Sequence, residues 1–252
     1  MNLIKRFLFE LQEVTHIIVY VARRVFKKPR YFAETVQQMD SIGVGSLSII
    51  LLTGFFTGGV LTLQGYPMLA YYGGQSQTGK FVAFTIIKEL GPVLTALMVA
   101  GRIGSAISAE LGSMVVSQQI DAMRALGTDP YRKLVAPRIV ALILMLPILT
   151  VACDVLGIIG GGVTANSLFD HNYNLFMTSV RNGVTTGDLV GGIIKPLCFG
   201  LIIGSISCYK GLSTKGGTVG VGRSTTNAVV VSSMVVIVAD FFLSRLLQHI
   251  FD

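Results

Sequence analysis

The sequence predicts an all-α integral membrane protein with an N-terminal interfacial amphipathic helix, five transmembrane helices, and a cytoplasmic helix between the second and third of them. Three observations support this fold class. Of the 252 residues, 52% are hydrophobic and only 13% are charged, whereas soluble domains carry about 25% charged residues. The apolar residues form five runs that can each cross a hydrocarbon core, for which about 20 residues suffice. Lys and Arg are distributed unevenly among the connecting segments.

The first 40 residues predict a helix that lies on the membrane surface. Apolar residues recur at helical spacing over residues 3–25, and basic residues occupy much of the other face. Acidic residues such as Glu10 interrupt the apolar run that a signal peptide requires. We expect the helix to end at Pro29. The alternative to a helix on the membrane surface is a cytoplasmic helix that packs against another subunit. Residues 1–40 thus form an amphipathic elbow region, and residues 41–252 form the transmembrane domain.

The orientation of the spans follows from the basic residues. The spans are expected near residues 42–63, 80–106, 139–165, 189–209 and 225–247, with a charge-free loop over 64–79. Seven Lys or Arg residues precede the first span, and the successive connections carry none, four, one and three, with none after residue 247. Because positive charge accumulates on the cytoplasmic side, we expect a cytoplasmic N-terminus and an exported C-terminus.

Two adjacent charges, Lys88 and Glu89, lie inside the second span. A charge in hydrocarbon costs roughly 2.5 to 3.5 kcal/mol, so such residues usually face a bundle interior, a water-filled cavity or a substrate path. Neighbours on a helix point about 100° apart, so at most one of them should face a cavity squarely, and Glu89 is the candidate. We expect Lys88 to pair across a dimer or to reach lipid headgroups. An ion pair that only orients helices is the alternative, and helix pairing is expected for Asp154, Lys195 and Asp240.

Residues 110–126 are too polar for the membrane but have apolar residues at helical spacing. They predict a cytoplasmic amphipathic helix of four turns that ends near Gly127, with Asp129 and Pro130 as stop signals. Such a helix is either a plain connector or the part that a cytoplasmic motor grips to move the spans.

Several other patterns have structural rather than chemical interpretations. Small residues four apart, as in Gly54 and Gly58 or Gly157 and Gly161, predict close helix packing. The three cysteines and three histidines lack metal-ligand spacing, so we expect no metal, cofactor or catalytic site. The basic residues that give the chain its positive net charge flank apolar spans, which argues against nucleic acid as a partner.

The segment 217–224 nearly spells a phosphate-binding P-loop. Arg223 replaces the required Lys, and no strand is expected before it. We therefore expect a flexible cytoplasmic hinge here, and any ATP hydrolysis on a partner subunit.

A series of short motifs resembles the MlaE (YrbE) family of ABC-transporter permeases, in register from about residue 43 to the C-terminus. The motifs are Lys88-Glu89-Leu90-Gly91-Pro92-Val93, Ala100-Gly101-Arg102, Ala109-Glu110-Leu111-Gly112-Ser113-Met114, Gln119-Ile120-Asp121-Ala122, Asp129-Pro130 and Pro137-Arg138, preceded by Leu63-Gln64-Gly65-Tyr66 and followed by Gly220-Val221-Gly222-Arg223, Thr225-Thr226 and Ala228-Val229-Val230.

The resemblance implies a homodimeric permease core in the bacterial inner membrane, with cytoplasmic ABC ATPase subunits and an MCE-domain protein that carries lipid across the periplasm. It leaves room for a small cytoplasmic regulatory subunit. The implied substrates are phospholipids, moved in maintaining outer-membrane lipid asymmetry. The direction of transport and the headgroup preference stay open.

The resemblance also assigns residues to two sites. Glu89, Lys88, Gln64 and Tyr72 match positions that line the family's lipid cavity, and on that reading Leu61, Met68 and Leu69 form an apolar wall for acyl chains, unless they are ordinary lipid-facing or core residues. The implied ATPase-coupling segment contains Glu110, Gly112, Met114, Gln118, Gln119, Asp121 and Arg124.

This chain departs from the family pattern at two of these positions. Gln118 stands where Glu is usual, so an ionic contact becomes a neutral one. Lys88 stands where Arg is common, and Lys cannot fork two hydrogen bonds onto one phosphate.

Two other functions fit the residues. An ion-coupled secondary transporter would use Glu89 and Asp154 as its ionisable groups. A non-transporting membrane anchor for a lipid-handling complex would need neither.

Overall fold

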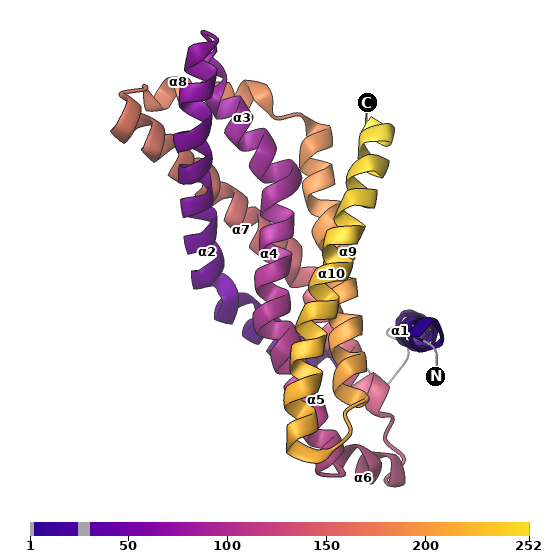
Figure 1. The fold of residues 1–252 in the computed structure, drawn as a ribbon. Coiled ribbons are helices and arrows are strands. Elements are labelled where there is room, and N and C mark those ends of the chain that lie inside the picture. Colours follow the sequence, from indigo (N-terminus) through magenta and orange to yellow (C-terminus); the bar gives the residue numbers. More distant parts are fainter. Residues whose placement is uncertain (1–2, 25–30, 252) are drawn as a thin grey trace. The chain divides into compact units, whose positions relative to one another are not determined.

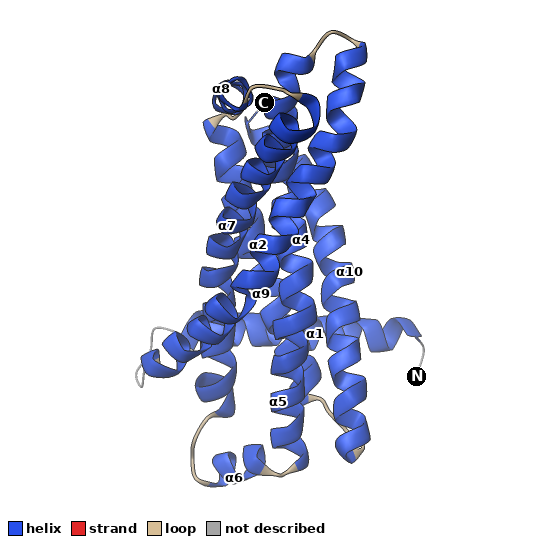
Figure 2. Ribbon diagram, turned by 90° about the vertical axis from the view of Figure 1, so that its left-hand side faces the viewer, coloured by secondary structure: helices blue, strands red, loops and turns tan. Residues whose placement is uncertain are grey.

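The structure, a computed structural model, describes residues 3–24 and 31–251, and this part of the chain is helical without any strand (Figure 2). Five segments are long and apolar enough to span a membrane: Phe32–Tyr71, Gln75–Val116, Tyr131–Phe169, Thr186–Leu212 and Gly217–His249. The predicted class, an all-α membrane protein with five spans, is confirmed. Each span includes the residues expected for it and extends beyond them.

The N-terminal helix α1 (Leu3–Arg24) is amphipathic, and Ile17 and Val21 on its apolar side are buried. It contacts η4 (Tyr131–Val135), the turn that precedes the third span. Pro29, which we expected to end this helix, lies outside the described residues.

Helix α2 (Phe32–Tyr71) is longer than predicted, because most of the expected loop after residue 63 is helical. The helix continues through Gly65 and Pro67, which do not end it. Gly73 has φ +70°, and the Gly73 and Gly74 amides donate to the carbonyls of Ala70 and Leu69. This is a Schellman motif, and it ends the helix.

The second span is one helical segment with two wider π-helical turns. It comprises the 3₁₀ turn η1 (Gln75–Gln77), α3 (Thr78–Thr85), the π turn η2 (Ile86–Leu90), α4 (Gly91–Val99), the π turn η3 (Ala100–Gly104) and α5 (Ser105–Val116) (Figure 1). Turns of this kind are rare and frequently lie at functional sites. Lys88 and Glu89 belong to η2.

The single four-turn helix expected over 110–126 is wrong. Helix α5 ends at Val116, and α6 (Gln119–Ala125) is a separate short helix. Between them Gln118 has φ 59°, a left-handed conformation that costs roughly 1–2 kcal/mol and breaks the helix. The apolar spacing continued through this position, so periodicity did not reveal the break. The predicted end near Gly127 is confirmed, since Gly127 has φ +74°.

The remaining helices are α7 (Ala136–Phe169), α8 (Tyr173–Gly183), α9 (Thr186–Leu212) and α10 (Gly217–Phe251). Helix α8 was not predicted; it packs beside α3 and buries Phe176 with Val82 and Ile86. The flexible hinge expected over 217–224 is wrong, because α10 begins at Gly217 and includes this whole segment.

The chain forms two compact units, one of residues 1–42, 97–145 and 198–238 and the other of residues 43–96, 146–197 and 239–252. We call them the first and second units. In the second unit a Cβ at Gly54 would lie 2.5 Å from the Cys153 carbonyl oxygen, and one at Gly58 would overlap the Gly157 carbonyl. The close packing predicted from small residues four apart is therefore confirmed for these helices.

Candidate functional site

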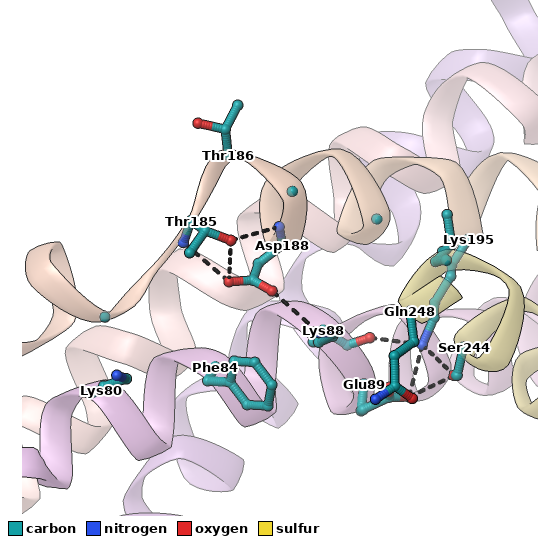
Figure 3. Close-up of a pocket in the computed structure, with 14 residues that line it drawn as sticks. Lys80, Phe84, Lys88, Glu89, Thr185, Thr186, Asp188, Lys195, Ser244 and Gln248 are labelled. Carbon is teal, nitrogen blue, oxygen red and sulfur yellow. Dashed lines mark hydrogen bonds and ion pairs between the residues drawn. The ribbon is translucent and has the colours of Figure 1, made fainter. Parts of the chain in front are cut away.

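A pocket of about 680 Å³ lies in the second unit, within the 300–1,000 Å³ range typical of small-molecule sites. Its lining combines three lysines, two carboxylates and several hydroxyl groups from α3, η2, α9 and α10 (Figure 3). The lining residues are Lys80, Phe84, Lys88, Glu89, Gly183, Thr185, Thr186, Gly187, Asp188, Gly191, Lys195, Ser244, Leu247 and Gln248.

Lys195 of α9 is the buried centre of this pocket's charge network, with a side chain only 1% exposed. Its ammonium group donates to Glu89 Oε2 at 2.7 Å, to the Lys88 carbonyl at 2.7 Å and to Ser244 Oγ at 2.8 Å. An ammonium group has three hydrogens, so all of them are used. Asp240 Oδ1 lies 3.1 Å from the same nitrogen as an ion-pair partner without a hydrogen bond of its own. Helix pairing, expected for Asp154, Lys195 and Asp240, is confirmed for Lys195 and Asp240, whereas Asp154 Oδ1 is buried without a hydrogen-bond partner within the described chain.

Local sequence explains why the Lys88 carbonyl is free to accept. In an α-helix this carbonyl would bond the amide four residues later, but residue 92 is proline and has no amide hydrogen. The Gly91 amide donates to the Ile86 carbonyl, five residues earlier and not four, which closes the π turn. The Gly91-Pro92 pair therefore widens the helix and creates the acceptor that Lys195 takes.

Lys88 reaches a different partner. Its ammonium group lies 3.4 Å from Asp188 Oδ1 and 4.7 Å from the centre of the Phe84 ring. The Thr185 amide and hydroxyl donate to Asp188 Oδ2 at 3.0 and 2.7 Å, which holds that carboxylate at the start of α9. Lys88 thus pairs within its own chain.

The side chains of Lys88 and Glu89 remain 28% and 40% exposed. They point to separate partners, Asp188 and Lys195, as the helix geometry predicted. Both line this pocket, and Glu89, the residue expected to face a cavity, is the more exposed of the two. Their ion pairs support the alternative that these charges orient the helices. Their exposed fractions show that both charged groups are nevertheless accessible to a ligand.

Leu61, predicted to contact acyl chains, lines a separate apolar groove of about 500 Å³. The other lining residues are Leu52, Thr53, Phe56, Thr57, Val60 and Leu90. Because Leu90 follows Glu89 in η2, the polar pocket and the apolar groove share one helical turn. Gln64, Met68, Leu69 and Tyr72 line neither; they lie near the end of α2, where Met68 and Tyr72 are 67% and 76% exposed.

The residues assigned to ATPase coupling lie in the first unit. Glu110, Gly112 and Met114 belong to α5, Gln118 forms the break, and Gln119, Asp121 and Arg124 belong to α6. Glu110 pairs with the buried Arg138 at 2.7 Å, and Asp121 pairs with Arg124 at 3.2 Å. A Cβ at Gly112 would lie 2.8 Å from Thr214 Oγ1, so this glycine permits close packing.

Asp188, Thr185 and Ser244 were missed by the sequence reasoning. The first two form a Thr-x-x-Asp capping box ahead of an apolar run, which is a signal readable in sequence. Ser244 lies four residues after Asp240 and so shares its helix face; that relation became informative only once Lys195 was seen to contact both.

The fold and the pocket define a multi-pass helical membrane protein that holds charged groups inside its spans, an arrangement typical of transport proteins. The chain belongs to the MlaE permease family: the family model described as Permease MlaE matches residues 35–246.

Named relatives agree with this assignment. A probable ABC transporter permease protein of Synechocystis is 44% identical over 84% of this chain and 81% of its own length. The intermembrane phospholipid transport system permease protein MlaE of Haemophilus influenzae is 36% identical over 86% of this chain and 84% of its own. The chloroplastic protein trigalactosyldiacylglycerol 1 of Arabidopsis thaliana is 40% identical over 89% of this chain and 64% of its own.

Proposed function

We propose that this chain is the membrane-spanning permease subunit of an ABC transporter that moves phospholipids between the inner membrane and an MCE-domain carrier in the periplasm. The observation that carries the proposal is a charged pocket and an apolar groove sharing the η2 turn, in a chain similar to an intermembrane phospholipid transport permease. A phospholipid needs a polar niche for its headgroup beside an apolar surface for its chains.

In this proposal Lys88 binds the lipid phosphate. Lys88 is a partly exposed cation of the pocket, as the exposed Lys80 also is, and the ion pair of Lys88 with Asp188 is longer than the contacts of Lys195. A phosphate entering the pocket would replace Asp188 as its partner. Lys195, buried and fully hydrogen-bonded, holds Glu89 and Asp240 in place and does not move to the ligand.

The proposed assembly contains a second copy of the chain, two cytoplasmic ATPase subunits, an MCE-domain carrier and a small cytoplasmic regulatory subunit. Energy comes from the ATPase, because residues 217–224 begin a helix and lack the lysine of a P-loop. The segment 110–126 docks on the ATPase, with Leu126 at its end 83% exposed. The distribution of Lys and Arg supports a cytoplasmic N-terminus and a periplasmic C-terminus.

The test is movement of a labelled phospholipid by the purified complex in proteoliposomes. We expect movement that requires ATP and the ATPase subunits, and that falls in Lys88→Gln. Arg181→Gln is the matched control, because Arg181 is an exposed cation of α8 outside the pocket.

Two other results would overturn the proposal. Movement driven by a proton gradient without the ATPase would indicate the ion-coupled secondary transporter. A complex that binds its partners but moves no lipid under either condition would indicate a non-transporting anchor.

A further inference from the structure

Helix α1 is tied to the connection between α6 and the third span. The Tyr20 hydroxyl donates a hydrogen bond to the Asp129 carboxylate. The Tyr20 and Tyr131 rings also pack at 5.5 Å between centroids with a 52° tilt. All of these residues lie in the first unit.

A second contact holds the same helix ten residues earlier. Glu10 Oε2 accepts a hydrogen bond from Lys210 Nζ, near the end of α9, at 2.8 Å. Ten helical residues span about 15 Å, so α1 is held at two well-separated points. Ile17 and Val21 are 2% and 6% exposed. A helix that served only to contact lipid would keep those side chains at the membrane surface, whereas here protein covers them.

Asp129 occupies a position from which it can set the placement of α6. Helix α6 ends at Ala125, Gly127 turns the chain, and η4 begins at Tyr131 and continues into α7. Asp129 Oδ1 accepts from the Tyr131 amide at 3.0 Å, and its carbonyl accepts from the Lys133 amide at 3.1 Å. Its carboxylate therefore fixes the first turn of η4 while its other oxygen binds Tyr20.

We propose that Tyr20 and Asp129 form a latch through which α1 positions α6, making the N-terminal helix a part of the coupling between ATP hydrolysis and lipid movement. This inference rests on the proposed function of the 110–126 segment. Tyr20 is a positioning residue: it contacts neither lipid nor the ATPase but holds the loop behind α6. A phenol–carboxylate hydrogen bond suits this role because charge-assisted bonds are short and roughly twice as strong as neutral ones.

The Glu10–Lys210 ion pair holds α1 in the position at which Tyr20 meets Asp129. If it set only local stability, removing its charge would lower melting temperature without changing coupling. As an element of the latch it makes a sharper prediction: Glu10→Lys and Lys210→Glu each reduce coupling, and the double exchange restores it because the pair is re-formed in reverse.

The experiment compares Tyr20→Phe with wild type in the reconstituted complex, measuring ATP hydrolysis and lipid moved per ATP hydrolysed. Loss of one charge-assisted hydrogen bond should lower the lipid moved per ATP roughly tenfold or more. The basal hydrolysis rate, the KM for ATP and co-purification of the subunits should stay as in wild type.

Two further variants separate a latch from general damage. Asp129→Asn should couple at a level between wild type and Tyr20→Phe, because its side-chain amide can still bond both the Tyr20 hydroxyl and the Tyr131 amide but carries no charge. Tyr31→Phe removes a hydroxyl from the same region outside the latch and should have no effect.

The outcomes separate the two levels of inference. Coupling in Tyr20→Phe equal to a working wild type would overturn the latch alone, as would a loss matched by equal loss of subunit assembly. A wild-type complex without ATP-dependent lipid movement would overturn the proposed function, and the latch with it.

Discussion

The ammonium group of Lys195 donates a hydrogen bond to the main-chain carbonyl of Lys88, a residue 107 positions earlier. That carbonyl lacks its α-helical donor because residue 92 is proline, and Lys195 supplies a donor in its place. The same ammonium group binds the side chain of Glu89. One buried lysine therefore binds both a main-chain carbonyl and a side-chain carboxylate of the π turn. These two contacts stabilise the turn inside a membrane span.

Pro92→Ala tests the origin of this acceptor. Restoring the amide lets residue 92 bond the Lys88 carbonyl in the α-helical pattern, so the turn can tighten and a main-chain donor competes with Lys195 for that oxygen. We expect reduced lipid movement with an equal or higher melting temperature, because proline inside a helix costs roughly 3 kcal/mol. Pro147→Ala, inside α7, is the control and should raise or maintain stability without reducing transport. Normal transport in Pro92→Ala would show that the carbonyl contact is dispensable.

Lys195→Met tests the network's contribution to stability. Glu89 and Asp240 would keep their charges without a cation, and breaking one side of a buried ion pair costs about 3 kcal/mol or more. The variant should unfold at lower temperature, as measured by circular dichroism, since the chain has no tryptophan to report by fluorescence. Adding Glu89→Gln and Asp240→Asn should recover much of the loss. No recovery would indicate that packing, not charge, dominates.

Glu89→Lys should impair lipid movement more than Lys88→Arg. Glu89→Lys places a second cation beside Lys195, whose Nζ now lies 2.7 Å from Glu89 Oε2. Lys88→Arg keeps a cation opposite Asp188. Lipid movement per complex is the measurement, with expression and assembly checked for both variants. Equal defects would contradict the separate roles of these neighbours.

Gly58→Ala should destabilise the second unit, because the added Cβ overlaps the Gly157 carbonyl of α7 and main chain cannot give way cheaply. Gly222→Ala is the matched control: its Cβ meets nothing within 4 Å. Alanine is favoured over glycine in a helix by roughly 0.5–1 kcal/mol, so this control should be neutral or stabilising. Thermal unfolding distinguishes the two, and equal effects would show that the helices separate readily.

Asp154→Asn separates ATP-driven from ion-coupled transport. Asp154 is 8% exposed, and its Oδ1 has no hydrogen-bond partner within the described chain. Asparagine preserves its shape but cannot ionise. In an ATP-driven permease the variant should move lipid at a rate close to wild type. A transport defect that follows the proton gradient would instead identify Asp154 as a coupling site.

The helices themselves were largely readable from the residues. Span length and side-chain period are local properties, so apolar runs predicted five membrane helices and Gly127 marked the end of the 110–126 segment. The charges at Lys88 and Glu89 also stood out, because a charged residue inside an apolar run can be identified from the sequence alone. The break at Gln118 escaped because apolar spacing continued across it.

By itself, then, the sequence determined the membrane class, the number of spans and which turn carries the unusual charges. Only the tertiary structure decided that Asp188 holds Lys88, that Lys195 holds Glu89 and Asp240, and that α8 packs on α3. The physical reason is the sequence distance involved. Hydrophobic periodicity and span length are set by residues a few positions apart, whereas an ion pair depends on which distant segments fold against each other.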